Sequence, residues 1–231
     1  MNNVVRRSGG LVVRKSPSPM NGPRVGTVFA LRTSGPPDFR TAALIAACRG
    51  LTLLALCACC LPLAALEVKG TPFPDQQVIG GATLKVAGGA RLNWKWVFTI
   101  YDAAFYLDAT AKAGVDPLSD VAKRYELVYR RTFTAAECVE ATDKTIGRGL
   151  PASEKAAVAA EIATLNAAYV EVKDGDRFAY TYLPGVGTTM SVNDRTLVTV
   201  PGAQLARVLF AIWVGPDPVD SDFCDRLLGR N

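Results

Sequence analysis

The sequence predicts an α+β fold, in which a long antiparallel sheet of about seven strands is covered on one face by three or four helices. Two observations predict it. Segments in which apolar and polar residues alternate come before and after a helical stretch, without the regular strand–helix alternation of a parallel sheet. Other segments place apolar residues at intervals of three and four, as helices that pack on a sheet do.

The strand pattern is clearest in the middle of the chain. From 92 to 100 the even positions are Leu, Trp, Trp, Phe and Ile, while the odd positions include Asn93 and Thr99. This alternation predicts one strand with one buried face, followed by a bulge near Asp102, where the alternation stops. The other expected strands are 75–79 and 82–87 around Gly80–Gly81, 123–131, and three short strands between 176 and 201.

The helices have recognisable starts and stops. Thr134 and Glu137 have the spacing of a capping box, so a helix is expected to begin there and to end near Gly147. Pro151 suits the first turn of the next helix. The apolar stripe of that helix consists of Val158, Ile162, Leu165 and Tyr169, and a further helix from Leu205 to Trp213 stops at Gly215–Pro216 before a short terminal one.

Composition excludes several kinds of chemistry. The 231-residue chain has no histidine, which removes Ser-His-Asp and Cys-His catalysis and histidine-bound zinc. It also lacks a Gly-rich phosphate loop and metal-ligand spacings, so we expect no metal and no cofactor. Residues up to Leu66 carry eight basic side chains and one acidic, whereas those from Glu67 onward carry 18 basic and 20 acidic. A near-neutral folded part argues against binding to nucleic acid.

The start of the chain has the features of an export signal. Residues 51–66 form an uncharged apolar run behind Arg49, too short for a comfortable membrane span. We therefore expect a secretory signal at 41–65 and an exported, periplasmic mature domain at 67–231 without a transmembrane span. Residues 1–40 are expected to be disordered, and translation from a downstream start codon would leave them out of the protein. Two alternatives stay open: a lipoprotein anchor at Cys59, or an uncleaved interfacial or buried helix.

Two cysteines, Cys138 and Cys224, belong to the expected mature domain. In an oxidising compartment they could form a disulfide. Cys138 also occupies a helical position where a small apolar side chain would serve, so unpaired burial is an equal alternative.

Five segments between residues 72 and 229 follow one another in a recognisable order: Gly88-Gly89-Ala-Arg91, WVFTIYDAAFYL, DGDRFAYTYLPGVGT, Asn193 and PGAQLARVLFAIWVGPDPVD. This order resembles the bacterial chalcone isomerase-like domain. The resemblance implies an open-faced β-sandwich, in which helices cover a long antiparallel sheet and a ligand cleft lies between them. Members of that family include plant enzymes that cyclise chalcones, fatty-acid-binding proteins and exported bacterial proteins.

The resemblance also implies site residues. The strand arginine of the plant enzymes falls on Arg91 and their strand threonine on Tyr101. Their helix tyrosine and asparagine fall near Cys138 and Thr145, so the groups that orient the reacting ketone are not matched. The sequence therefore leaves open whether the chain is an enzyme at all.

The position of the cation is a second open point. Bacterial relatives tend to place their arginine eight residues before the strand tyrosine, which here is Asn93. Arg91 and Tyr101 would lie about 33 Å apart in one straight strand, so they share a site only if the chain folds back around 93–95. Lys95 is the substitute cation if Arg91 points to solvent.

The main functional hypothesis is a non-catalytic binder of a small amphipathic ligand, a fatty acid or a phenolic compound. Its candidate ligand-binding residues are Arg91, Tyr101, Asn93, Lys95 and Thr145, with Trp94, Trp96, Phe98 and Trp213 beside the apolar part of the ligand. Two alternatives remain: an isomerase or lyase acting inside one substrate molecule, and an envelope interaction protein whose rings are simply core.

Overall fold

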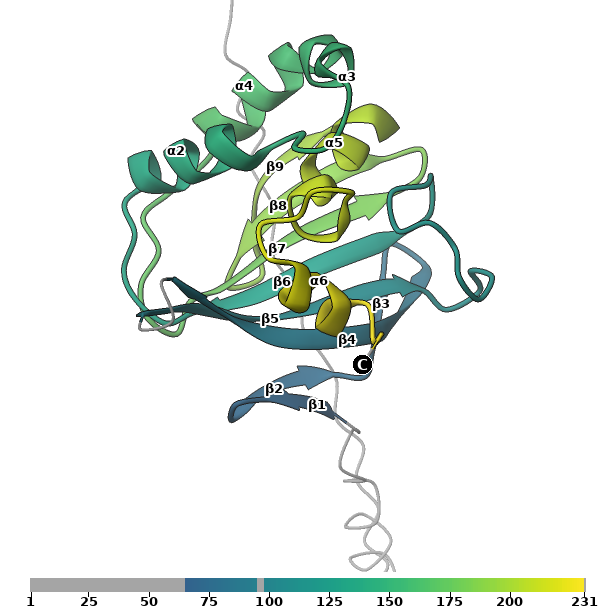
Figure 1. Ribbon diagram of the computed structural model, residues 1–231, viewed down its shortest axis with the longest axis vertical. Helices are drawn as coiled ribbons and strands as arrows, with labels where there is room; N and C mark the ends of the chain where they lie inside the picture. The colour runs from purple at the N-terminus through teal and green to yellow at the C-terminus, as the bar shows by residue number, and fades with distance from the viewer. Residues whose placement is uncertain (1–64, 95–97, 231) are drawn as a thin grey trace, which may run out of the picture. The chain divides into compact units, whose positions relative to one another are not determined.

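The computed structural model describes residues 65–94 and 98–230 (Figure 1). The predictions for residues 1–64, including the signal and the Cys59 anchor, lie outside this range, as do Lys95 and Trp96, and they stay predictions. Within the described residues, no helix has the length and the apolar character needed to cross a membrane.

The fold is built on one sheet of seven strands, each antiparallel to its neighbours, as the sequence predicts. The strands follow one another across the sheet in chain order, and the longest connection, between Tyr129 and Arg177, contains three of the helices. They are β3 (Gln76–Ile79), β4 (Ala82–Trp94), β5 (Phe98–Asp108), β6 (Lys123–Tyr129), β7 (Arg177–Leu183), β8 (Gly187–Val192) and β9 (Arg195–Val200).

Helices cover one face of this sheet (Figure 1). They are α2 (Ala135–Thr145), α3 (Ala152–Ala157), α4 (Ala159–Ala167), α5 (Ala203–Val214) and α6 (Ser221–Leu227). The predicted capping box begins α2: the Thr134 hydroxyl accepts a hydrogen bond from Glu137 N at 3.2 Å, and the Glu137 carboxylate accepts one from Thr134 N at 2.8 Å. Helix α5 is the central covering element, because nine of its side chains are buried.

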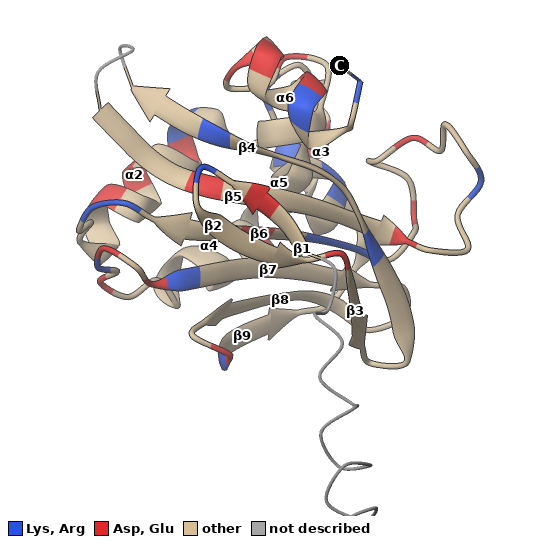
Figure 2. Ribbon diagram, turned by 90° about the horizontal axis from the view of Figure 1, so that it is seen from below, with Lys and Arg blue, Asp and Glu red and all other residues tan. Residues whose placement is uncertain are grey.

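A two-stranded hairpin, β1 (Ala65–Val68) and β2 (Thr71–Pro74), lies against the opposite face (Figures 1 and 2). The sheet therefore has a helix-covered face and a hairpin-covered face, each with its own core. The core under the helices is the larger one and contains most of the buried aromatic rings. Phe73 and Tyr106, both fully buried, belong to the core under the hairpin.

The prediction of one strand over 92–100 is wrong. β4 ends at Trp94, and β5 begins at Phe98 and runs back beside it, so that Trp94 and Phe98 face each other. Because β6 pairs with β5 only from Tyr101 onward, both residues lie where the sheet is reduced to two strands, and they are 61% and 54% exposed. They are not part of the core, and the expected apolar lining loses two of its four rings.

Cys138 and Cys224 are both buried and unpaired. Of the two alternatives, the structure shows separate burial. Cys138 lies on α2 and Cys224 on α6, and burial raises the pKa of each thiol, so neither is a ready nucleophile at neutral pH.

Candidate functional site

Arg91 and Tyr101 lie on opposite faces of the sheet. The register pairs Arg91 with Asp102 and Leu92 with Tyr101, and residues paired across two antiparallel strands point to the same face. Arg91 therefore faces the hairpin, where its Nε donates to Asp102 Oδ1 at 2.6 Å. Tyr101 faces the helices. The chain does fold back between these two residues, as a shared site would require, but their side chains remain on opposite faces of the sheet.

The other predicted ligand-binding residues are also apart from Tyr101. Asn93 is exposed on the hairpin formed by β4 and β5, where its side-chain oxygen accepts from the Thr99 hydroxyl at 3.0 Å. The Thr145 hydroxyl donates to the carbonyl oxygen of Ala141, one turn earlier in α2, at 2.7 Å. Neither side chain bonds to Tyr101 or to a neighbour of Tyr101, so their roles stay predictions without geometric support.

Tyr101 belongs instead to a group of buried rings under the helices, which we call the tyrosine cluster: Tyr101, Tyr125, Tyr129, Tyr169, Tyr180 and Trp213. The Tyr125 ring stacks on the Trp213 ring, with centroids 4.0 Å apart and planes 20° apart. Tyr101 meets the Tyr125 and Tyr129 rings edge-on, at 6.3 Å and 6.2 Å. These are favourable aromatic geometries, which make the cluster a rigid apolar wall.

Polar groups line this wall. Trp213 Nε1 donates to the Tyr101 hydroxyl at 3.1 Å. The Tyr169 hydroxyl is hydrogen-bonded to the Thr142 hydroxyl of α2, at 2.7 Å, and to the Tyr180 hydroxyl. The Tyr125 hydroxyl is buried and has no hydrogen-bond partner among the described residues. A buried hydroxyl without a partner is unusual in a native protein and indicates a place for a further polar atom.

Helix α2 contacts the cluster through two polar side chains. Its two buried residues are Cys138 and Thr142, one turn apart on the same face. Thr142 bonds to Tyr169, and the Cys138 sulfur lies 4.0 Å from the Tyr129 hydroxyl. The contacts of the helix with the cluster are therefore polar, while Ala135 and Val139 pack, partly buried, against the surrounding core.

The cluster is a set of neutral hydrogen-bonding groups at physiological pH. Burial raises the pKa of Tyr101 to about 12, and burial also raises the pKa of Tyr169 to about 12. Both hydroxyls therefore stay protonated. Among the described residues, no group of three Asp, Glu, Cys or His side chains could hold a metal ion. The arrangement can bind and orient an oxygen atom of a ligand in an apolar environment.

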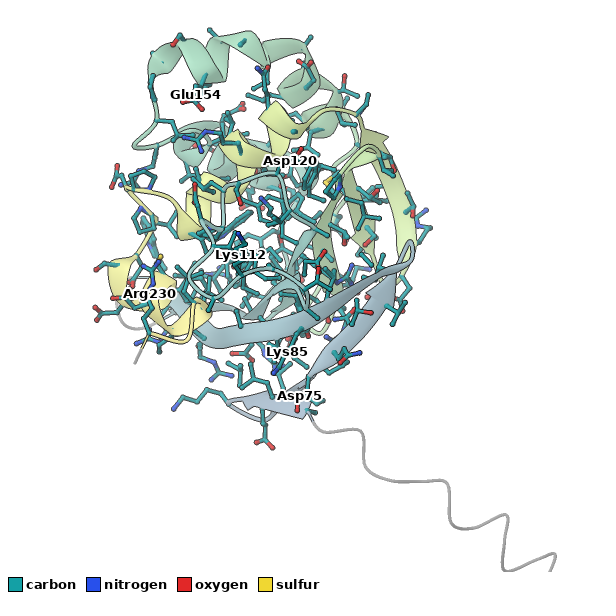
Figure 3. The ribbon with its side chains drawn as sticks, turned by 90° about the vertical axis from the view of Figure 1, so that its right-hand side faces the viewer. Asp75, Lys85, Lys112, Asp120, Glu154 and Arg230 are labelled. Carbon is teal, nitrogen blue, oxygen red and sulfur yellow. The ribbon has the colours of Figure 1, made fainter. Side chains whose placement is uncertain are left out.

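The tyrosine cluster lines neither of two surface cavities. One, of about 540 Å³, lies at the loop before β6, around Lys112 (Figure 3). The other, of about 440 Å³, lies on the hairpin-covered face and is bordered by Arg124 and Arg177. Because the residues of the cluster are at most 8% exposed, a ligand there must displace a covering element.

Residues 65–229 match the chalcone isomerase-like family. The chain belongs to this family. A solved structure of similar fold is the fatty-acid binding protein of Arabidopsis thaliana, with a TM-score of 0.55 and 14% identity over 70% of this chain and 93% of that one. At this identity the likeness concerns the fold alone, which is the open-faced sandwich that the sequence predicts. No curated protein matches the chain.

The sequence does not mark the tyrosines around Tyr101 as site residues. Tyr169 belongs to a predicted helical stripe, and Tyr129 lies in the core, as its place in an alternating strand predicts. One signal could have found Tyr129 and Tyr180. Tyr125 and Tyr129 are an even number of residues apart on β6, and Tyr180 of β7 pairs with Tyr125. Once the strand order is known, all three therefore point to the same face.

The helix-covered face also holds a buried cation. Lys123 is the one charged side chain that β5, β6 and β7 place on this face, and it is 1% exposed. Its Nζ donates to the Ser119 carbonyl and lies 5.4 Å from the Tyr182 ring centre and 5.7 Å from that of Phe210. No described carboxylate pairs with it, and burial lowers the pKa of Lys123 to about 8, although Asp116 and Asp120 oppose the change.

Replacing Lys123 by methionine is expected to stabilise the protein at pH 7 by about 1 kcal/mol, because the buried charge lacks an acidic partner. The folded-state pKa of about 8 lies below the ordinary 10.5, so the folded protein releases this proton first. Wild-type stability should therefore gain from this residue as the pH rises from about 8 towards 10.5, and Lys123→Met should lack that gain. Unfolding by urea, followed by circular dichroism across this pH range, measures both effects.

Lys85 provides the matched control, because it is exposed on β4 (Figure 3). Lys85→Met makes the same chemical change without removing a buried charge, and it should leave stability within about 0.5 kcal/mol. A Lys123→Met protein that is clearly less stable than wild type at pH 7 would show that the contacts to Ser119 and to the two rings outweigh the cost of burial.

Proposed function

We propose that this chain binds a small amphipathic carboxylic acid, such as a fatty acid, between the sheet and helix α2, and that it catalyses no reaction. The observation that carries the proposal is the tyrosine cluster: apolar rings with inward hydroxyls, one of them, on Tyr125, without a partner. Membership of the chalcone isomerase-like family supports it, as does the fatty-acid binding protein among the structures of similar fold. Export, predicted from residues 51–66, is part of the proposal, and N-terminal sequencing of the mature protein tests it.

The head group would be held by hydroxyls. Tyr125 would donate to the carboxyl group, and Tyr101, with Trp213 behind it, would provide a second hydrogen bond. Arg91 has no part in this arrangement, because it faces the hairpin. Since no cation lies in the cluster, the acid would bind in its neutral, protonated form, which burial favours. Affinity should therefore rise as the pH is lowered.

The ligand would enter by displacing α2. This helix is largely exposed, and its contacts with the cluster are the hydrogen bond of Thr142 and the long contact of Cys138. Two glycines with positive φ, Gly147 and Gly149, follow the helix and allow the chain to turn sharply there. Displacing α2 would cost little compared with displacing the deeply buried α5.

The positions that match the catalytic helix residues of the plant enzymes argue against catalysis. Cys138, near the tyrosine position, has a thiol whose pKa is raised by burial. Thr145, near the asparagine position, uses its hydroxyl within its own helix. The thiol is only a weak donor and the Thr145 hydroxyl is already used, so these two positions would not hold the ketone of a chalcone for ring closure as a tyrosine and an asparagine would.

Titration calorimetry with dodecanoic acid tests the proposal on the purified full-length protein. Wild type should bind, and Tyr125→Phe and Tyr101→Phe should each weaken binding roughly tenfold through the loss of one hydrogen bond to the head group. The control is Thr188→Val, which removes another buried hydroxyl without a partner, on β8 and outside the cluster. Absence of binding by wild type, or equal losses in all three variants, would contradict the proposal.

A further inference from the structure

The hairpin-covered face contains a buried cluster of charges that the proposed function does not use. Its centre is Glu126, which is 2% exposed. The carboxylate accepts from Arg124 Nε at 2.8 Å, from Gln77 Nε2 at 2.9 Å and from Arg177 Nη1. Burial alone would raise the pKa of Glu126, but these neighbours, Arg124 first, bring it below its ordinary value. Glu126 is therefore ionised at neutral pH.

The charges of this cluster do not balance. Two guanidinium groups share one carboxylate, which leaves one positive charge in excess. Arg124 is the more deeply placed, with 10% of its side chain exposed. Its Nη1 donates to the Thr181 hydroxyl at 2.7 Å, but its Nη2 makes no hydrogen bond with a described residue. Buried charges are normally paired, so this excess indicates a missing anion.

A cavity of about 440 Å³ adjoins these groups, between the β1–β2 hairpin and the sheet. It is lined by Ala65, Pro72, Pro74, Gln77, Arg124, Glu126, Arg177 and Asp194. Asp194 is exposed in the turn between β8 and β9 and lies within ion-pair distance of none of the described arginines. The excess positive charge of Arg124 and Arg177 therefore faces a space large enough for a small ligand.

A hydroxyl without a partner belongs to Tyr106, a strand neighbour of Arg124, although Tyr106 does not itself line the cavity. Tyr106 is fully buried on β5, directly opposite Arg124 on β6, and its hydroxyl has no hydrogen-bond partner among the described residues. Burial raises the pKa of Tyr106 and the charge of Glu126 adds to this, while Gln77, Arg124 and Arg177 oppose it. The hydroxyl stays protonated at neutral pH and is a hydrogen-bond donor without an acceptor.

We propose that this cavity is a second binding site, which takes a small oxyanion: a carboxylate or phosphate group that accepts hydrogen bonds from Tyr106 and from the free nitrogen of Arg124. Each donor that lacks a partner in the structure then gains one, and the excess charge is neutralised. Arg177, whose Nη2 donates to the Pro72 carbonyl at 3.1 Å, links the site to the hairpin that covers it. This site does not depend on the ligand proposed for the tyrosine cluster.

Acetate and inorganic phosphate are the probes. The full-length protein is titrated with each at constant ionic strength, with chloride as the balancing ion, and the melting temperature and calorimetric Kd are recorded. Wild type should be stabilised by at least one of them in a saturable way. Tyr106→Phe removes a hydroxyl that makes no bond in the structure, so it should melt as wild type does in chloride and bind the anion roughly five- to tenfold more weakly.

Thr188→Val is again the matched control, because its buried hydroxyl also lacks a partner but lies on the other face. It should bind the anion as wild type does. The probe that binds with the lower Kd shows whether the site prefers a carboxylate or a phosphate. Stabilisation no greater than in chloride, or an unchanged Kd in Tyr106→Phe, overturns the proposal, and neither result bears on binding of dodecanoic acid at the tyrosine cluster.

Discussion

Replacing Asp102 by asparagine is expected to lower the free energy of unfolding by about 3 kcal/mol, because it removes the buried negative charge that two arginines share. Asp102 is fully buried, and its carboxylate accepts from Arg91 Nε at 2.6 Å, Arg130 Nε at 2.7 Å and the Thr71 hydroxyl at 2.6 Å. Asparagine leaves both arginines without an anion and turns an N–H₂ group towards donors. Because Thr71 begins β2, the hairpin also loses a contact with the sheet. Urea unfolding measures the loss.

Glu140→Gln is the control for this substitution. Glu140 pairs with Lys144 on the exposed surface of α2, with about two thirds of each side chain in solvent. Removing its charge should change stability by less than about 0.5 kcal/mol, as for other exposed pairs. If Asp102→Asn cost no more than this control, Asp102 would not be what joins the hairpin to the sheet.

The effect of Asp102→Asn should depend on pH. Burial alone would raise the pKa of Asp102, but the hydrogen bonds from Arg91, Thr71 and Arg130 together bring it below its ordinary value of 3.8. A carboxyl group whose pKa is lowered on folding contributes its full stability above the ordinary pKa and loses it as the pH falls through the folded value. The difference between wild type and Asp102→Asn should therefore be constant near neutral pH and shrink below about pH 4.

The interpretation of Arg91 shows where a sequence pattern stops being informative. Alternation over 92–100 fits one strand or the two arms of a hairpin, since both have a period of two. The arms turn between Trp94 and Phe98, and their register sets Arg91 opposite Asp102. A shift of one residue would have set it opposite Tyr101 and on the same face. The face to which Arg91 points depends on the turn and on a bulge at Leu92/Asn93, and the sequence specifies neither plainly enough.

The elements themselves were predictable because their signals are local. The capping box at Thr134 begins α2, and the alternation over 123–131 corresponds to β6. The site was less predictable, because it is assembled from three strands and two helices that meet only in the fold. Tyr101 could be found from the family pattern. Trp213 was expected beside the ligand, but its bond to Tyr101 and the part of Tyr129 become visible only when their neighbours are known.

Replacing Gly88 by alanine is expected to destabilise the protein by about 3 kcal/mol, through steric overlap with backbone that cannot move alone. A Cβ at this position on β4 would lie 2.1 Å from the Arg226 carbonyl oxygen and 3.0 Å from that of Leu227, at the end of α6. The helix would have to shift outward. Because its Phe223 ring packs 6.1 Å from the Tyr101 ring, the shift should also loosen the tyrosine cluster.

Gly89→Ala provides the comparison, because adjacent residues of a strand point to opposite faces. A Cβ at Gly89 would meet the hairpin side, at 2.8 Å from the ends of the Leu66 and Val68 side chains and from the Ala103 carbonyl oxygen. Two of these three contacts are side-chain ends that can rotate, so the loss should be about half that of Gly88→Ala. Thermal unfolding measures both losses, and near-ultraviolet circular dichroism should change for Gly88→Ala more than for Gly89→Ala. Equal losses would mean that α6 moves as easily as two side chains. The two glycines would then be needed for the contact with the hairpin, and close packing of β4 against the helix would not be limiting.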